Sequence, residues 1–402
     1  MKDIKVLIAP GHYLFSDKYG SEPLWAFEIV KHLSSKLSSL DVIVGVVDLI
    51  QPIPENVRLF PIYSGKSRNP FIEFVKRLLF YPLLLIKFIL LNSKQKYQIV
   101  HHMFPLSLAT INLIVFYIKL FKIPIKLVLG PLQLPQDSSS PHDLDIVLVG
   151  EPIPLPLSNL INNLYHVLLR FIKPISLQMF NFADLIIFNS NVSRVYYSKF
   201  IPKVKQVVIP TGVEYIKENI FRSTQKEVKI ICVGGLSVRK GQIYLLDAFL
   251  YLSKKYSNLS LTFVGDGDER TSYESYVTRH DLKRVKFTGR LPHTELTNFY
   301  KSHDIFCLPS ISDPSPTVVL EAMSYGLPVV ASDVGSVSEM IGDAGLIVKK
   351  GNAEQLDKAL SKLIENKQLR VLLGNKGKER IEKIYNWDKI SEQWLKLYID
   401  NI

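Results

Sequence analysis

Residues 305–330 read IFCLPSISDPSPTVVLEAMSYGLPVV, an apolar run, a loop rich in proline and serine, and a second apolar run. The two apolar runs are typical of buried strands, and the segment between them indicates a helix. Ser315 suits the N-cap and Pro316 the first helical position, so we predict that the helix begins there. The free N–H groups at such a helix start favour a phosphate group, and they include those of Thr317, Val318 and Val319.

Two carboxylates flank this predicted helix start. Asp313 lies in the loop, and Glu321 follows eight residues later, inside the helix. Next to an anion site, these acids are better suited to holding sugar hydroxyls than the phosphate itself. The segment therefore indicates a nucleotide-sugar site. The alternative is an ordinary capped helix with a solvated glutamate.

The spacing D-x7-E, followed by AMSYGLPVVAS, resembles the E-x7-E signature of the family 4 (group 1) retaining glycosyltransferases. Asp313 stands where the family has its first glutamate, and residues 314–316 replace the family's Gly-Phe-Gly. The resemblance implies an α/β fold of the GT-B type, with two Rossmann-like domains facing across a cleft. It also implies metal-independent sugar transfer without a cofactor, with the nucleotide-sugar as substrate. The resemblance is strongest over residues 229–398.

A basic loop, VGGLSVRKG at residues 233–241, follows another predicted strand and precedes a helical pattern. Gly234 and Gly235 allow a tight turn, while Arg239 and Lys240 are suited to clamping a diphosphate. The loop resembles the family's V-G-R-L-x-x-x-K-G, with Lys240 at the lysine position. The family's arginine falls on Gly235, and Arg239 is our candidate to replace it. A solvated basic turn is the alternative.

The first predicted strand runs into the loop APGHYLFSDKYGSEP, at residues 9–23. Gly20 resembles the glycine that lets this loop of the family approach the donor phosphate. Glu22 and Trp25 are candidates for the acceptor groove. Alternatively, Glu22 is a helix-start carboxylate and Trp25 a core residue.

Two further strand ends supply candidate residues. The run IVHH at residues 99–102 resembles the family strand that ends in a histidine contacting the transferred sugar. Either His101 or His102 fits, since neighbouring strand residues point to opposite faces. Near residue 290, the sequence resembles the family loop whose backbone contacts the nucleobase of the donor. Arg290 and Leu291 are therefore candidates for this contact. The predicted catalytic set is thus Lys240, Arg239, Glu321 and one of the two histidines.

Apolar runs that fit buried strands recur along the chain, at 5–9, 42–47, 99–102, 125–129, 185–188, 207–210, 229–233, 261–264, 285–288, 305–308, 329–331 and 345–348. Helical patterns lie between most of them, which predicts parallel sheets covered by helices. With 402 residues, two domains are expected. We predict an acceptor-binding domain at 1–213, a linker at 214–228, a donor-binding domain at 229–384 and a terminal helix at 385–402 that crosses back to the first domain.

The net charge of +12 calls for an anionic partner or surface. Lysines and arginines alternate with apolar residues at 76–96 and 119–126, which favours docking on an anionic membrane surface. The alternative is a helix that covers a sheet and turns its lysines to water. Nucleic acid is disfavoured because no recognised binding motif accompanies the charge. The longest apolar run, at 78–91, is too short to span a bilayer.

Cys232 and Cys307 lie in apolar runs, which predicts buried, reduced thiols and a cytoplasmic compartment. The N-terminal apolar run is too short for a secretory signal. We therefore expect a cytoplasmic enzyme that is peripheral at the inner face of the membrane. The predicted activity is retaining transfer from a nucleotide-sugar to a glycan or lipid-linked acceptor, in cell-envelope polysaccharide or glycolipid synthesis. A GT-B-type nucleotide-sugar epimerase and a non-catalytic sugar-nucleotide-binding scaffold are the alternatives.

Overall fold

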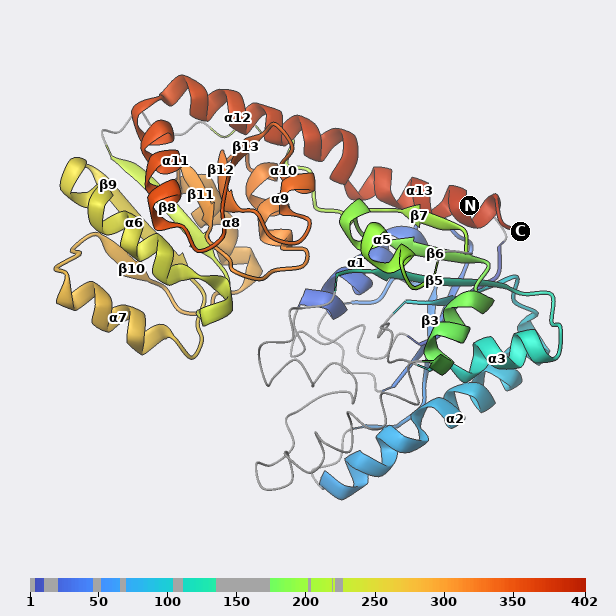
Figure 1. Ribbon diagram of the computed structural model, residues 1–402. Coiled ribbons are helices and arrows are strands. Elements are labelled where there is room, and N and C mark those ends of the chain that lie inside the picture. Colours follow the sequence, from blue (N-terminus) through green and yellow to red (C-terminus); the bar gives the residue numbers. More distant parts are fainter. Residues whose placement is uncertain are drawn as a thin grey trace. The chain divides into compact units, whose positions relative to one another are not determined.

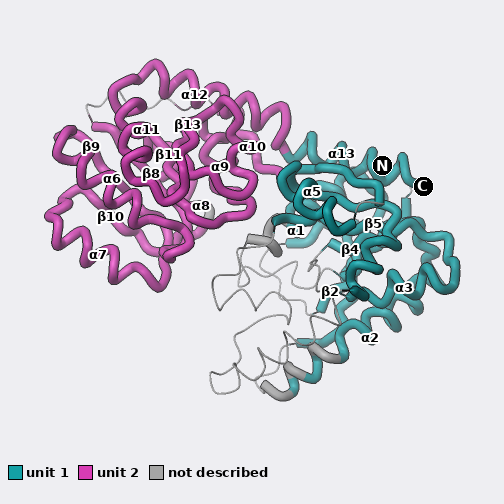
Figure 2. Tube along the Cα trace, viewed as in Figure 1, with its two compact units in different colours: residues 1–211, 387–402 teal, residues 212–386 magenta. Residues whose placement is uncertain are grey.

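The computed structural model describes residues 4–10, 21–45, 52–65, 70–103, 111–134, 174–201, 204–218, 220 and 227–402. The chain forms two compact units (Figures 1 and 2). The N-terminal unit comprises Met1–Thr211 together with Trp387–Ile402, and the C-terminal unit comprises Gly212–Asn386. The last helix of the chain therefore completes the unit in which the chain begins.

The N-terminal unit is built on a parallel sheet whose strand order is β3-β2-β1-β4-β5-β6-β7. Apart from Lys126 at the start of β5, its interior strands are fully buried, which is typical of a sheet with helices on both faces. The strands are β1 (Val6–Ile8), β2 (Leu40–Val44), β3 (Val57–Pro61), β4 (Ile99–His102), β5 (Lys126–Leu132), β6 (Leu185–Phe188) and β7 (Gln206–Val208).

Alternate residues of these strands feed two separate cores. Val6 and Ile8 pack with α1 and α13 on one face, whereas Leu7 packs with α2, α3, α5 and the helix 174–182 on the other. The helices are α1 (Ser21–Ser34), α2 (Pro70–Gln95), α3 (Leu113–Leu120), α5 (Asn191–Ser198) and α13 (Trp387–Ile399).

The C-terminal unit has a parallel sheet in the order β10-β9-β8-β11-β12-β13. Val228, Ile230 and Cys232 of β8 face α6 and α11, while Ile231 and Val233 face α8 to α10. The strands are β8 (Val228–Val233), β9 (Leu259–Val264), β10 (Val285–Phe287), β11 (Ile305–Leu308), β12 (Val329–Ser332) and β13 (Gly345–Val348).

The helices of the C-terminal unit cover both faces of its sheet (Figure 1). A 3₁₀ turn, Val238–Lys240, precedes α6, and a π-helical turn, Ile381–Tyr385, follows α12. The helices are α6 (Gln242–Lys255), α7 (Arg270–Arg279), α8 (His293–Ser302), α9 (Thr317–Ser324), α10 (Val337–Ile341), α11 (Ala353–Glu365) and α12 (Lys367–Arg380).

The prediction of two Rossmann-like α/β domains is confirmed. One strand was missed, and one predicted helix start needs correction. Strand β3 was not expected, because only Val57 of its five residues is buried and the segment lacks a continuous apolar run. The apolar run at 78–91 lies inside the longer helix α2, with Pro82 in its interior. Helix α9 begins at Thr317, with Pro316 rather than Ser315 at the N-cap.

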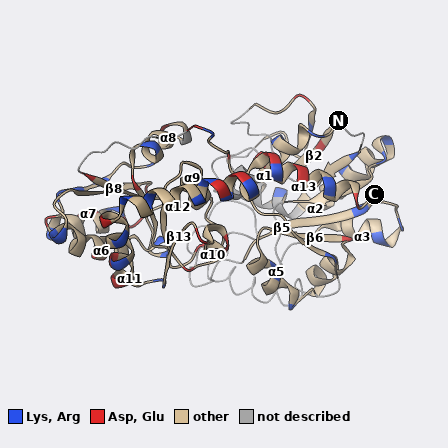
Figure 3. Cartoon of the chain, turned by 90° about the horizontal axis from the view of Figure 1, so that it is seen from above, with Lys and Arg blue, Asp and Glu red and all other residues tan. Residues whose placement is uncertain are grey.

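Both cysteines are free and buried, as predicted. Burial raises the pKa of the Cys232 thiol to about 12, which keeps it protonated at neutral pH. In the described part of the chain, no helix is both long enough and apolar enough to cross a membrane. Lysines and arginines occur on both units, so the positive charge is not confined to the first half of the sequence (Figure 3).

Candidate active site

The loop after β8 approaches the end of β9 so closely that side chains are excluded. Gly234 adopts φ +148° and donates its N–H to the carbonyl of Val264 at 2.9 Å. At Gly265, with φ +139°, a Cβ would lie 2.1 Å from the carbonyl oxygen of Gly234. Gly235 has no such constraint, because its added Cβ would be 3.6 Å from its nearest neighbour. Only the first of the two predicted turn glycines is therefore required by the backbone.

Lys240 and Arg239 contact the loop between β11 and α9. This loop follows β11, the strand that pairs with β8. Lys240 Nζ is 2.5 Å from Asp313 Oδ2, and both side chains are largely buried. Arg239 Nη1 donates to the carbonyl of Ser312 at 3.1 Å. The carbonyl of Arg239 in turn accepts from the amides of Ile311 and Ser312. The two loops singled out in the sequence thus form one basic and acidic site at the carboxyl ends of β8 and β11.

The start of α9 leaves polar groups without partners. Val319 donates its amide to the carbonyl of Pro316, so it is not available to a ligand as predicted. Thr317 and Val318 are the first helical residues, and their amides have no acceptor among the residues described. Ser315 Oγ is also buried, and it has no hydrogen-bond partner among the residues that the structure describes. A buried hydroxyl beside two unused amides indicates a site for an anionic ligand.

The loop that carries Asp313 is fixed by residues that sequence reasoning missed. Gly335 has φ +50°, and a Cβ there would lie 2.2 Å from the carbonyl oxygen of Asp313 and 2.4 Å from that of Pro314. Ser336 donates both its amide and its hydroxyl to the carbonyl of Pro314, at 3.0 and 3.1 Å. The pair Gly-Ser at 335–336, shortly after the buried strand β12, was the available signal.

Glu321 is oriented by a buried tyrosine that was also missed. Tyr300 donates its hydroxyl to Glu321 Oε2 at 3.0 Å. The ring of Tyr300 stacks on Tyr325, with centroids 5.2 Å apart. Burial, together with the Glu321 carboxylate, raises the pKa of Tyr300 well above its ordinary value, so it remains a donor. The carboxylate of Glu321 therefore has a defined rotamer and a defined hydrogen-bond donor.

Arg290 and Leu291 follow β10 at the same edge of the sheet. The amide of Gly265 donates to the carbonyl of Gly289 at 3.0 Å, which joins this loop to the end of β9. Arg290 is exposed, and Leu291 packs against the core beneath α8 and α9. The carboxyl ends of β10, β8 and β11 thus carry the predicted donor residues of this unit, at the edge of a parallel sheet where ligand sites are expected.

The candidates of the N-terminal unit are less completely described. Gly20 lies outside the described residues. Glu22 and Trp25 lie in the first turns of α1, and their side chains are outside the described part of the chain. Their predicted acceptor roles stay predictions.

The two histidines of β4 have different surroundings. His101 is fully buried, with Nε2 2.7 Å from the carbonyl oxygen of Gly130 and Nδ1 2.7 Å from the hydroxyl of Tyr398. Its ring also packs against Trp394 of α13, with centroids 5.2 Å apart. Because a carbonyl only accepts, Nε2 carries the proton and Nδ1 accepts from Tyr398. Both ring nitrogens of His101 therefore hold α13 and β5, which leaves His102 as our candidate for sugar contact.

Asn112 determines the tautomer of His102. Its Oδ1 accepts from the amide of Ile114 at the start of α3, so its Nδ2 must donate. That Nδ2 lies 3.0 Å from the carbonyl oxygen of Ala9 and 3.3 Å from Nδ1 of His102. In neutral His102 the proton is consequently on Nε2. Sequence reasoning did not identify Asn112.

The buried imidazole of His101 predicts a loss of stability in mild acid. Burial lowers its pKa to about 3, below the ordinary value of 6.5. The unfolded chain binds the proton more readily, so this contribution is complete above about pH 6.5 and is lost progressively as the pH falls toward 3. Between pH 7 and pH 5 we expect His101 to account for a loss of about 2 kcal/mol.

Urea unfolding of the wild type and of His101→Gln at both pH values measures this loss. The variant is expected to lose correspondingly less stability than the wild type when the pH falls. An equal loss in the two proteins would show that His101 does not carry the effect.

A doubly wound sheet with phosphate-suited loops at its strand ends defines a nucleotide-binding α/β protein. Residues 216–380 match the family model of the group 1 glycosyl transferases. Residues 216–380 therefore resemble the family 4 (group 1) glycosyltransferases at the level of the family model, and the chain has the GT-B fold that the sequence resemblance predicted.

Curated relatives match part of the chain. An uncharacterized glycosyltransferase of Haemophilus influenzae is 34% identical over 169 residues, which cover 41% of this chain and 47% of that protein. A Campylobacter jejuni protein is 28% identical over 256 residues, 62% of this chain and 69% of that protein. Its name is GalNAc-alpha-(1->4)-GalNAc-alpha-(1->3)-diNAcBac-PP-undecaprenol alpha-1,4-N-acetyl-D-galactosaminyltransferase. The chain spans about half the length of the first of these relatives.

The solved structures extend the likeness of fold to the whole chain. Anabaena Alr3699/HepE in complex with UDP has a TM-score of 0.68 and 18% sequence identity. The match covers 99% of this chain and 100% of that one. At this identity the similarity establishes the fold alone.

Proposed function

We propose that this protein is a retaining glycosyltransferase that moves a sugar from a nucleotide-sugar to a glycan or lipid-linked acceptor. The observation that carries the proposal is the contact of Lys240 with Asp313, 2.5 Å long, beside the start of α9. It joins a cation suited to phosphate and a carboxylate suited to sugar within the residues that match the family model. A purely structural ion pair would not explain why the amides of Thr317 and Val318 beside it lack acceptors among the described residues.

One group of site residues contacts the diphosphate of the donor, and another group contacts its ribose and its sugar. Lys240, Arg239 and the amides of Thr317 and Val318 stabilise the negative charge that builds on the leaving diphosphate. Glu321, oriented by Tyr300, holds the ribose diol, and Asp313 turns from Lys240 to a sugar hydroxyl when the diphosphate arrives. No metal is required, because the cations and the helix start supply the positive charge.

The bond changes follow the mechanism that the family resemblance implies. The acceptor oxygen attacks the anomeric carbon from the face that the diphosphate leaves, so that the configuration is retained. The bond between this carbon and the phosphate oxygen breaks as the new glycosidic bond forms. The proton of the acceptor hydroxyl passes to the departing phosphate oxygen. His102, with its proton on Nε2, is our candidate to hold the transferred sugar.

A panel of donors tests the proposal against its alternatives. The full-length protein is incubated with UDP-, GDP- and TDP-sugars, each labelled in the sugar, together with a bacterial membrane extract. Label that moves into lipid or glycan with retained configuration supports the transferase. An isomerised free donor would instead indicate an epimerase, and donor binding without turnover by any acceptor would indicate a scaffold.

A lipid-linked acceptor is favoured by the surface of α2. Its outward residues Ile72, Leu79, Ile86 and Leu90 are between 46% and 59% exposed. At 100° per residue they fall within about 40° of one another on the helix. Leu120 and Phe121, at the end of α3, are exposed as well, and α3 contacts α2. The Campylobacter relative is named for an undecaprenol-linked substrate, which agrees with docking at a membrane.

Charged substitutions on α2 should release the protein from anionic vesicles. In Ile86→Glu/Leu90→Glu we expect binding to vesicles containing phosphatidylglycerol to fall by at least about tenfold, because burying one such side chain contributes about 1.5–3 kcal/mol. Co-sedimentation measures the binding. Leu372→Glu, at an exposed leucine of α12, is the matched control and should bind as the wild type does. Equal binding of all three proteins would remove α2 from the docking surface.

A further inference from the structure

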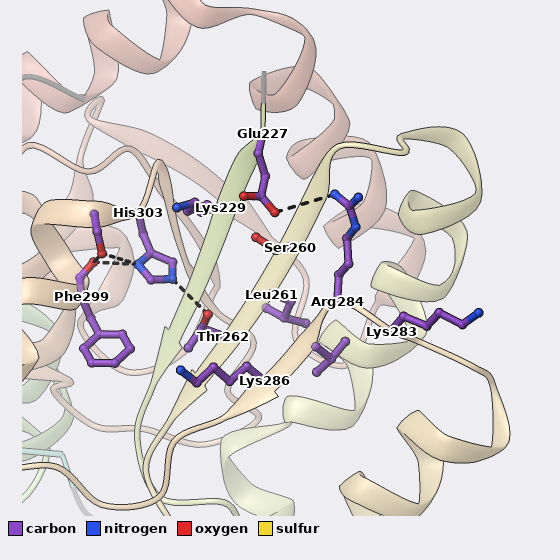
Figure 4. Close-up of a pocket in the computed structure, with 12 residues that line it drawn as sticks. Glu227, Lys229, Ser260, Leu261, Thr262, Lys283, Arg284, Lys286, Phe299 and His303 are labelled. Atoms are coloured by element: carbon purple, nitrogen blue, oxygen red, sulfur yellow. Dashed lines mark hydrogen bonds and ion pairs between the residues drawn. The ribbon is translucent and has the colours of Figure 1, made fainter. Parts of the chain in front are cut away.

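The sheet of the C-terminal unit carries a second basic surface, at the opposite ends of its strands from the donor loops. A pocket of about 400 Å³ opens there, beside the end of α8 (Figure 4). Lys229, near the start of β8, lines it, four residues before the strand ends at Val233. At about 3.3 Å per residue, it is about 13 Å along the strand from the donor loop. None of the lining residues belongs to the loops 234–241 or 309–317.

Strand register brings cations and hydroxyls together on the floor of this pocket. Lys229 pairs with Ser260 between β8 and β9, and Thr262 pairs with Lys286 between β9 and β10. These four residues share one face, since strand side chains alternate. Neighbouring strands are about 4.8 Å apart, so the lysines of β8 and β10 flank the hydroxyls of β9. This spacing allows one oxyanion to contact both ammonium groups.

Four cations line the pocket, and two of them, Lys283 and Arg284, are paired with carboxylates. Glu227 is its only acidic lining residue, and it lies 3.8 Å from Arg284. Lys229 and Lys286 form no ion pair with any residue that the structure describes. Figure 4 shows the ammonium group of Lys229 beside His303 and that of Lys286 farther along the pocket, below Thr262. Two like charges held on one small surface favour the binding of an anion between them.

His303 gives the pocket a rigid, buried wall. It is 6% exposed, with Nδ1 2.8 Å from the carbonyl oxygen of Phe299 and Nε2 3.0 Å from Thr262 Oγ1. Since the carbonyl accepts from Nδ1, the neutral ring accepts the proton of the Thr262 hydroxyl at Nε2. The hydroxyl of Thr262 is thereby held in place, and Phe299 adds an apolar surface at the same rim (Figure 4).

Protection of a sheet edge explains only part of this arrangement. Lysines on an edge strand prevent pairing with another chain, and Lys286 lies on the edge strand β10. Lys229 lies on β8, between β9 and β11 in the interior of the sheet, where no such protection is needed. A polar, basic face on an interior strand requires another reason.

We propose that this pocket binds a small phosphorylated molecule, with its phosphate above Ser260 and between Lys229 and Lys286. A pocket of about 400 Å³ lies within the range of small-molecule sites, roughly 300–1,000 Å³. Phe299 covers the apolar face of the ligand. The site is separate from sugar transfer and stands whether or not the transferase activity is found.

Isothermal titration of the full-length protein tests the site, with inorganic phosphate and a hexose phosphate as probes at constant ionic strength. In Lys229→Ala/Lys286→Ala we expect affinity for the hexose phosphate to fall by at least about tenfold, because two charge-assisted hydrogen bonds are lost. Lys358→Ala is the matched control, since Lys358 is an exposed lysine of α11 that pairs with Glu354 and does not line the pocket. It should bind as the wild type does.

A third variant separates this pocket from the donor site. Lys240→Ala should leave affinity for the hexose phosphate unchanged. A loss of binding in Lys240→Ala but not in the double variant would assign the probe to the donor site and overturn the proposal. The proposal would also be overturned if neither inorganic phosphate nor the hexose phosphate bound to the protein. This holds even if Lys229 and Lys286 were found to bind anionic vesicles. The thermal midpoints of all variants verify that they are folded.

Discussion

Lys240→Ala is expected to lower kcat/KM for sugar transfer by about 10²–10³-fold, the usual effect of removing one group that stabilises a developing negative charge. The wild-type lysine is held 2.5 Å from Asp313 within a largely buried site. Its charge is therefore less screened than that of a surface lysine, and in the proposed mechanism it acts where the diphosphate leaves. Most of the loss should appear in kcat, because the charge on the leaving group is greatest in the transition state.

Initial rates with the donor found in the panel measure this effect. Lys358→Ala provides the control for loss of one positive charge, because Lys358 is 70% exposed on α11 and pairs with Glu354 one turn away. It should retain wild-type turnover. Unchanged turnover in Lys240→Ala would refute the assignment of the donor site, and with Glu321→Ala also unchanged it would end the transferase proposal.

Trp394→Ala is expected to lower the free energy of unfolding of the N-terminal unit by about 3–5 kcal/mol. Trp394 is 1% exposed and packs between His101 of β4 and Tyr398. Its removal leaves a cavity in the core that α1, α13 and the sheet share. The C-terminal helix would then lose its largest fully buried side chain.

Urea unfolding followed by tryptophan fluorescence reports on this unit selectively. All three tryptophans of the chain, Trp25, Trp387 and Trp394, belong to it. Leu372→Ala, at an exposed position of α12, should leave the transition where it is. Trp394→Phe should recover most of the loss, because a ring still fills the site. A Trp394→Ala protein as stable as the wild type would show that α13 is not needed by the N-terminal core.

Much of the fold was predictable because local pattern and tertiary environment agree. The apolar runs that end at His102, Val233 and Leu308 are strands in the structure, since both faces of a parallel sheet are buried. The pattern failed at β3, where Arg58 is half exposed and pairs with the buried Asp41 of β2. An edge strand held by an ion pair has no continuous apolar run to reveal it.

The start of α9 shows how local rules fail at a site. Ser315 followed by Pro316 is a good capping sequence, yet the helix begins one residue later and the hydroxyl of Ser315 is buried without a partner in the described part of the chain. The loop is instead held by Gly335 and Ser336. The local capping preference of Ser315 is overridden here by tertiary contacts, and these contacts leave polar groups available for a ligand.

The sequence by itself determined the alternation of strands and helices, and the positions of Lys240, Asp313 and Glu321 at strand and helix ends. Hydrophobic periodicity and turn residues act over a few residues, so they can be recognised in the sequence alone. Only the tertiary structure decided that Lys240 meets Asp313, 73 residues away, and that His101 binds Tyr398, 297 residues away. Those contacts depend on β8 lying beside β11 and on the last helix returning to the first unit. Strand order and helix docking are set by the burial of whole faces, which no local stretch of sequence encodes.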